Sequence, residues 1–215
     1  MFAIATAMLS LAGKAAFWGS ADLNRVASER LIDRTRESAD ELGRQRDQEQ
    51  VRNLLSGARA LAPGNANYAL EAGRSFETAA DREADPELRS EFARQALAAY
   101  ENAVALRPTW GRAWMFLASR RYREFGIDEV TLIAIEQAQN LGPWELDVLE
   151  GLAKLGMQAW SGLPAKAQQS MWKTIQHAAR ERELQRRLLL WSREVGWEPY
   201  LRRAIAQDDA ARASR

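Results

Sequence analysis

The stretch ARQALAAYENAVALRPTWGRAWMFLASRRY, residues 93–122, decides the fold. It carries the spacing A-x3-aromatic-x2-A-x4-P at Ala96, Tyr100, Ala103 and Pro108. Small residues let two helices approach closely, an aromatic ring fills the gap between them, and a proline ends the helix. The stretch therefore predicts one helix that ends before Pro108 and a second helix that turns back after it.

The same spacing recurs along the chain, which is typical of a tetratricopeptide-like repeat. Pro108 and Pro143 are 35 residues apart, close to the period of about 34 residues of that repeat. Pro63 and Pro108 are 45 residues apart, and we place the extra residues in 78–89, as lengthened helices or a longer loop. The further copies are Val51, Leu55, Ala58 and Pro63; Thr131, Ile135, Ala138 and Pro143; and Met171, Ile175 and Ala178, without a proline.

Each repeat unit consists of two helices, and we expect the first helix of the next unit to follow each proline. No repeat unit buries its apolar face alone, so neighbouring units stack. The sequence predicts an all-α fold, a tetratricopeptide-like helical hairpin array (α-solenoid), over residues 51–206, with 183–206 as its cap and 207–215 as a frayed tail. The small and apolar residues of the expected first helices are Ala69, Ala72, Gly73 and Phe76; Trp114, Leu117 and Ala118; and Leu149, Leu152, Ala153 and Gly156.

Residues 1–20, MFAIATAMLSLAGKAAFWGS, form a largely apolar segment that Lys14 interrupts. A membrane span needs about 20 predominantly apolar residues, and Phe17 and Trp18 suit a membrane interface. We interpret the segment as a transmembrane anchor; a cleaved signal peptide and an apolar helix packed on the domain stay open as alternatives. Residues 21–50 carry acids and arginines at helical spacing, which predicts a charged helical stalk.

The composition excludes several classes of protein. Apolar residues make up 47% of the 215, enough for a buried core, and charged residues make up 27% with a net charge of +1. This balance argues against a nucleic-acid partner, because a basic excess supplies most of the affinity for nucleic acid. The chain has no cysteine, so disulfides and thiolate metal sites are excluded.

The sequence contains no arrangement of residues suited to catalysis. His177 is the only histidine and precedes Glu181 by four residues on a predicted helix, but nothing groups further metal ligands around it. No glycine-rich phosphate loop follows a strand. Asp128 and Glu129 are better explained as the N-cap and first turn of a helix. We therefore expect a protein that is not an enzyme, with no catalytic residue, no metal and no cofactor.

Aromatic residues gather after Pro108, and the candidate partner-binding residues are Trp110, Trp114, Arg121 and Tyr122. Rings at helical spacing are core residues in most proteins; alternatively, they line the surface of the array and grip an extended peptide or stack on sugar rings. Arginines bind carboxylates and phosphates well, but the run at 120–123 also fits a solvated face. Further aromatic residues on the array are Phe116, Trp144, Trp160 and Trp172.

The chain resembles the VpsP-like accessory proteins encoded with bacterial exopolysaccharide clusters, over about residues 52–200. The most specific segments are LGPWE at 141–145, in which Trp144 follows Pro143, WSGLP at 160–164, and ALRPTW at 105–110. The resemblance implies a single-pass anchor in the bacterial inner membrane, with the repeat domain on the periplasmic side. It also implies a role in polysaccharide synthesis, assembly or export through protein contacts, and it brings no catalytic residues.

The leading hypothesis is a non-catalytic, membrane-tethered helical-repeat scaffold that mediates protein–protein contacts in exopolysaccharide synthesis or export. Its partners are expected to be other proteins of a polysaccharide machine, and the membrane through the N-terminal segment. Three alternatives stay open: a direct glycan-binding protein of the cell envelope, a subunit that completes another protein's active site, and a general tetratricopeptide assembly factor or chaperone.

Overall fold

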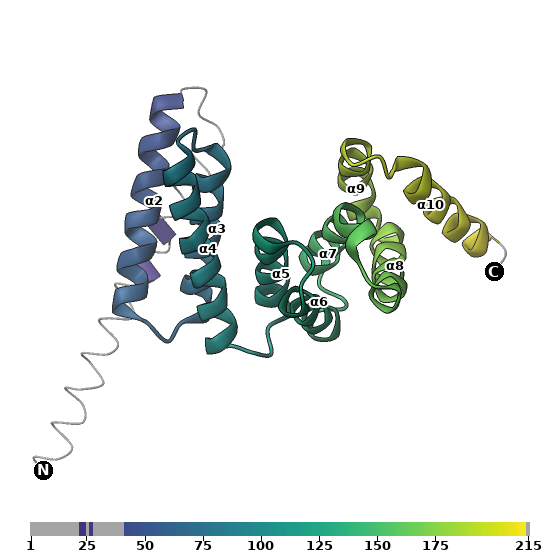
Figure 1. Ribbon diagram of the computed structural model, residues 1–215, viewed down its shortest axis with the longest axis horizontal. Coiled ribbons are helices and arrows are strands. Elements are labelled where there is room, and N and C mark those ends of the chain that lie inside the picture. Colours follow the sequence, from purple (N-terminus) through teal and green to yellow (C-terminus); the bar gives the residue numbers. More distant parts are fainter. Residues whose placement is uncertain (1–21, 25, 28–40, 214–215) are drawn as a thin grey trace, which may run out of the picture. The chain divides into compact units, whose positions relative to one another are not determined.

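The computed structural model describes residues 22–24, 26–27 and 41–213, and every element in this part of the chain is a helix, with no strand (Figure 1). The predicted all-α class is confirmed. The chain divides between Pro108 and Thr109 into two compact units, residues 1–108 and 109–215, which we call unit 1 and unit 2.

The described part of unit 1 is built mainly from long helices with short connections. α2 spans Glu41–Leu61, α3 spans Ala66–Arg82 and α4 spans Pro86–Leu106. Asn65 caps α3, because its side-chain oxygen accepts a hydrogen bond from the Asn67 amide at 3.0 Å. α3 and α4 pack against each other as a hairpin, and α2 packs against α3.

The extra residues expected in 78–89 lengthen the two helices rather than the loop. The connection between α3 and α4 is only 83–85. The Asp85 carboxylate accepts hydrogen bonds from two amides at the start of α4, at 2.8 and 3.3 Å. Pro86 occupies the first turn of α4, where its missing N–H costs no hydrogen bond. The Asp–Pro pair that interrupts the repeat pattern is therefore a helix start.

Tyr100 is the central side chain of the interface between α3 and α4. Tyr100 is fully buried, with 0% of its surface exposed, and a Cβ added to Gly73 would lie 2.5 Å from its ring. Its hydroxyl donates to Glu77 Oε2 at 2.7 Å, and burial together with this carboxylate raises the pKa of Tyr100 well above its ordinary value. A second apolar cluster joins α2 to α3 through Val51, Leu55, Ala72 and Phe76.

Unit 2 is a series of helical hairpins. The first helices of successive hairpins also pack on one another, because α5 contacts α7 and α7 contacts α9. Gly126 and Gly196 take positive φ values of 71° and 73° in the turns after α5 and α9. The hairpins are α5 (Gly111–Phe125) with α6 (Glu129–Leu141), α7 (Leu146–Ala159) with α8 (Ala165–Arg180), and α9 (Arg182–Glu194) with α10 (Glu198–Ala213), and the short 3-10 turn η1 (Trp160–Gly162) follows α7.

The repeat-pattern residues that lie on the second helix of each repeat unit are all buried, with at most 3% of their surface exposed. Glycines on the first helices leave room for these buried side chains. For example, a Cβ added to Gly156 would lie 2.3 Å from Cγ of Met171. This burial is what stacked hairpins require, and the fold is consistent with an α-solenoid. The buried positions are Val51, Leu55 and Ala58; Ala96, Tyr100 and Ala103; Thr131, Ile135 and Ala138; and Met171, Ile175 and Ala178, with Pro63, Pro108 and Pro143 following α2, α4 and α6.

The segment interpreted from the sequence as a membrane anchor, residues 1–20, lies outside the described residues. Among the residues that the structure does describe, no helix is long and apolar enough to cross a membrane. Within the predicted stalk, 21–50, the described residues are helical, and α2 runs through residue 50 without a break. At the other end α10 extends to Ala213, past residue 207, where the sequence analysis places the start of a frayed tail.

Candidate functional site

Trp110 and Trp114 lie at the start of α5. Trp110 is the residue before the helix, its side chain makes no capping hydrogen bond, and Trp114 follows one turn later. Both residues are half-buried, as is Phe116. The structure therefore brings these two candidates together at one end of α5, where part of each ring contributes to packing and part faces solvent.

The other two candidates, Arg121 and Tyr122, contact different neighbours. The Tyr122 hydroxyl donates to the backbone oxygen of Gln158 at 3.2 Å, which ties α5 to the end of α7. Arg121 donates from Nη2 to Asp128 at 2.7 Å, and its guanidinium lies 4.9 Å from the centroid of the Phe125 ring. Consecutive residues point about 100° apart around a helix. The structure therefore does not bring Arg121 and Tyr122 onto one binding surface.

Asp128 is the residue that holds Arg121 in place. Its carboxylate caps α6 by accepting a hydrogen bond from the Thr131 amide at 2.7 Å, and it also binds Arg121. Hydrogen bonding from Thr131, through its backbone amide, and then from Arg121 lowers the pKa of Asp128 to about 2. Arg121 thus closes the turn between α5 and α6.

We expect Asp128→Asn to remove an acid-sensitive part of the stability of unit 2. Aspartate in an unfolded chain has a pKa of about 3.9. The lower folded pKa therefore stabilises the fold above that pH, and this contribution is lost as the pH falls through about 2. Thermal midpoints of the two proteins, followed by circular dichroism, should differ near neutral pH and converge towards about pH 2. A difference that stays constant with pH would contradict this role of Asp128.

A row of polar contacts joins α5, α7 and α9 across unit 2. Arg112 on α5 pairs with Asp147 on α7 at 2.8 Å. Glu150 on α7 pairs with Lys154 of the same helix at 2.7 Å and with Arg187 on α9 at 3.1 Å. We call the residues that link these helices the first-helix face: Arg112, Tyr122, Asp147, Glu150, Lys154, Gln158, Arg187 and Trp191.

Glu150 lies at the centre of the first-helix face. Only 15% of its side chain is exposed, and two cations neutralise it, as a partly buried carboxylate requires. The Lys154 ammonium also lies 5.8 Å from the centroid of the Trp191 ring, within reach of a cation–π attraction. Arg187 keeps 55% of its side chain exposed. The first-helix face thus carries charged groups and an indole ring, and contacts between the helices hold these groups in position.

The first-helix face is not evident from the sequence of any single helix. Within one helix, the only signal is the spacing of Glu150 and Lys154, four residues apart. The contacts between helices join residues 35, 36 or 37 positions apart, from Arg112 to Asp147, Tyr122 to Gln158 and Glu150 to Arg187. These separations are close to the repeat period. A search for complementary side chains one repeat apart could therefore have found the face.

Trp144, which belongs to the predicted repeat signature, is 77% exposed. Its ring meets the His177 ring edge-on, with 4.8 Å between centroids. His177 Nε2 lies 3.9 Å from a carboxylate oxygen of Glu181, the residue that follows α8. Over the described ranges, no group of three or more side chains is arranged to hold a metal ion. The contacts of His177 are thus an aromatic ring and one carboxylate.

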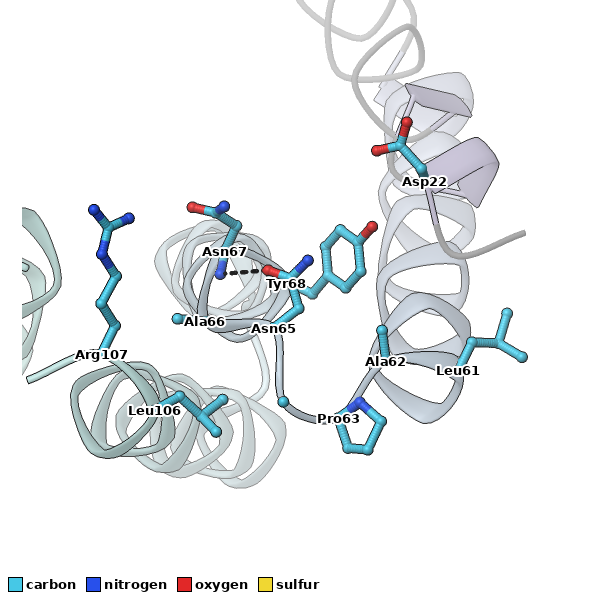
Figure 2. Close-up of a pocket in the computed structure, with 11 residues that line it drawn as sticks. Asp22, Leu61, Ala62, Pro63, Asn65, Ala66, Asn67, Tyr68, Leu106 and Arg107 are labelled. Carbon is cyan, nitrogen blue, oxygen red and sulfur yellow. Dashed lines mark hydrogen bonds between the residues drawn. The ribbon is translucent and has the colours of Figure 1, made fainter. Parts of the chain in front are cut away.

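Unit 1 contains a cavity of about 690 Å³ beside the start of α3 (Figure 2). The end of α2, the start of α3 and the end of α4 contribute to its wall, and Asp22 lies at its edge. Its lining mixes apolar residues with one acid, one base, Arg107, and the amides Asn65 and Asn67. The lining has no excess of one charge and no group of hydrogen-bond donors, so it does not favour one class of ligand.

Comparisons of the chain with protein-family models and with curated proteins find no match. The chain matches none of the protein-family models against which it was compared. A search of curated proteins likewise finds no significant match. A function for this chain is therefore inferred from its own residues and from the surfaces that they form.

Proposed function

We propose that this chain is a non-catalytic, membrane-tethered helical-repeat scaffold that mediates protein–protein contacts in exopolysaccharide synthesis or export. The first-helix face of unit 2 is the observation that carries the proposal. It runs over three successive hairpins, and ion pairs and hydrogen bonds between α5, α7 and α9 hold its polar groups in position. Stacked hairpins form extended surfaces, and pre-arranged groups lower the entropic cost of binding a partner.

The chemistry of the first-helix face favours one kind of partner segment. Lys154 places positive charge beside the Trp191 ring, and Arg187, which precedes Trp191 by one turn of α9, is largely exposed. Aromatic and arginine side chains supply most of the energy at protein interfaces, and complementary charges set orientation and speed of association. The face therefore suits a helix or extended segment in which an acidic residue lies next to an apolar one.

Two features of the sequence support the remaining parts of the proposal. The apolar residues 1–20 supply the tether. The resemblance to VpsP-like proteins, carried by residues 105–110 and 141–145, connects the scaffold with exopolysaccharide machinery. A tether keeps the binding face at a high local concentration relative to membrane partners, so modest affinity is sufficient for assembly.

Affinity capture from membranes of the native organism tests this function. The full chain would carry a tag at its C-terminus, and mass spectrometry would identify what co-purifies. Recovery of glycosyltransferase, polymerase or export components from the membrane fraction would support the proposal. Recovery of the chain from the soluble fraction alone, without envelope proteins, would remove both the tether and the polysaccharide assignment.

Arg187→Glu should lower the recovery of these partners about tenfold, because it replaces an exposed cation of the first-helix face with a charge that repels an acidic segment. The matched control is Arg182→Glu, which makes the same charge change at an exposed position of α9 outside the face. Quantitative mass spectrometry at equal amounts of captured chain compares the two. Equal losses would show that net charge, and not the face, determines binding.

A further inference from the structure

Four aromatic side chains of unit 2 meet where η1, α8 and the start of α10 come together. The ring centroids of Trp160 and Trp197 are 5.0 Å apart, and the Trp172 ring lies 6.4 Å from both. Tyr200 extends the group, with its ring 5.3 Å from Trp197. We call these four residues the aromatic cluster. Each ring is held by at least one other ring, so the group is rigid before any ligand arrives.

The aromatic cluster lies at the surface of unit 2. Trp160, Trp172 and Trp197 are half-buried, and Tyr200 is 57% exposed. Within the described part of the chain, the three indole N–H groups donate to no acceptor. They are not buried without a partner, so solvent or a ligand can reach them. The cluster therefore offers both ring surface and hydrogen-bond donors to a ligand.

Two arginines bind the carboxylate of Glu198, which follows Trp197 of the aromatic cluster in the sequence. Arg193 and Arg202 both donate to Oε1 of Glu198, the residue after Trp197, at 3.0 Å and 2.7 Å. Arg193 uses only Nε for this contact and Arg202 uses Nε and Nη2, so other N–H donors of both guanidinium groups stay unused. Their side chains are 54% and 57% exposed. Glu198 thus holds two exposed cations at the start of α10, the helix that carries Tyr200, without neutralising both.

The segment that carries the aromatic cluster is basic, although the whole chain is almost neutral. Residues 160–207 contain nine lysines and arginines but four aspartates and glutamates, whereas the chain as a whole has a net charge of +1. All nine of these basic residues are exposed. An exposed excess of positive charge attracts anions and raises their local concentration. The partner of this surface should therefore be acidic.

We propose that the aromatic cluster and the pair Arg193 and Arg202 bind an acidic polysaccharide. Sugar rings stack on the exposed parts of the aromatic rings, and indole N–H groups donate to sugar hydroxyls. Carboxylates on the sugar accept charge-assisted hydrogen bonds from the unused guanidinium donors. This site goes beyond the protein–protein contacts of the first-helix face, and neither surface depends on the other.

An acidic membrane surface is the competing source of negative charge, and the structure disfavours it. Insertion into a membrane interface requires an apolar helix face that is free to enter the lipid. Leu184, Leu188 and Leu201 of α9 and α10 are 0% exposed, because the core of unit 2 already uses them, and Leu190, at 53%, is the one largely exposed leucine of these two helices. Trp160 also packs edge-on against Trp172 and Trp197, and the other two ring pairs of the cluster are tilted. A sugar needs only ring surface and donors that are already in place.

Calorimetric titration of the detergent-solubilised full chain with short oligomers of galacturonic acid tests the proposal. The double variant Arg193→Gln/Arg202→Gln should raise the Kd for these oligomers about tenfold, because it removes the charge-assisted hydrogen bonds. Tyr200→Ser should weaken binding about as much, because it removes the most exposed ring of the aromatic cluster. Both changes affect exposed side chains, so unit 2 should keep its fold, and circular dichroism checks this.

Matched controls separate the site from its surroundings. Arg182→Gln/Arg186→Gln removes two exposed charges of α9, and Trp144→Ala removes an exposed ring that lies outside the aromatic cluster. Each control should change the Kd less than about twofold. Neutral maltose oligomers, poly-L-glutamate and phosphatidylglycerol vesicles serve as the other ligands.

The expected result is binding of galacturonic acid oligomers that exceeds binding of both the neutral sugar and polyglutamate. The absence of saccharide binding would overturn the proposal. Equally tight binding of polyglutamate would overturn it as well, and so would an equal loss of affinity in the two double variants. Either result would mean that net charge alone attracts the ligand. Vesicle binding that requires the aromatic cluster, without saccharide binding, would assign the surface to a membrane. None of these outcomes depends on partners of the first-helix face.

Discussion

Tyr100→Ala should destabilise unit 1 by about 4 kcal/mol, the typical cost of deleting a fully buried aromatic ring. The ring fills the space between α3 and α4 that Gly73 leaves open. Its loss leaves a cavity in a helix–helix interface and also removes the 2.7 Å hydrogen bond to Glu77. Urea denaturation followed by circular dichroism measures the loss of stability, and hydrogen exchange of the α3 and α4 amides locates it.

Tyr100→Phe is the control for this experiment. It keeps the ring and removes only the hydroxyl, so we expect a cost of about 1 kcal/mol. Glu77, the partner of the hydroxyl, is half-buried and has access to water. If the phenylalanine variant were as unstable as the alanine variant, the hydrogen bond rather than the packed ring would hold the hairpin together.

Gly111→Ala should destabilise unit 2 by about 3 kcal/mol, the upper part of the range for overpacking. A Cβ on Gly111 would lie 2.5 Å from the backbone nitrogen of Gly142 and 2.9 Å from the carbonyl carbon of Leu141. These are backbone atoms, so no side-chain rotation relieves the clash, and the start of α5 must move away from the end of α6. Thermal unfolding of the two proteins measures the difference.

Gly162→Ala provides the matched change in the same unit. A Cβ at this position would meet Ile127 at 3.4 Å, an ordinary contact, and the cost should stay below about 1 kcal/mol. Neither Gly111 nor Gly162 has a positive φ, so backbone strain affects neither substitution. Equal losses in the two variants would contradict the argument that close approach of α5 and α6 requires Gly111.

The helical pairing of this chain could largely be predicted from local spacing. Ala96, Tyr100 and Ala103 lie on one side of a helix only at helical periodicity, and the structure buries all three. The region around Asp85 and Pro86 was harder, because a proline suits both the end and the first turn of a helix. Whether such a residue ends one helix or begins the next depends on the helix that packs beside it.

The candidate sites were less accessible to sequence reasoning than the fold. The arginine run at 120–123 fits a solvated face, yet Arg120 is 7% exposed and pairs with Glu124 at 2.6 Å. Trp160 and Trp197 are far apart in the sequence but neighbours in space. Such contacts depend on how one hairpin is placed on the next, and the pattern within one helix carries no information about that placement.

The packing of unit 2 also has a kinetic consequence. Its main contacts join each helix to the next helix or to the one after that, so neighbours in space are close in sequence throughout the described residues of the unit. Chains with such short-range contacts close small loops at each step and fold in about microseconds to milliseconds. Any of the hairpins can start the process. A substitution that slows one hairpin should therefore redirect folding through another instead of blocking it.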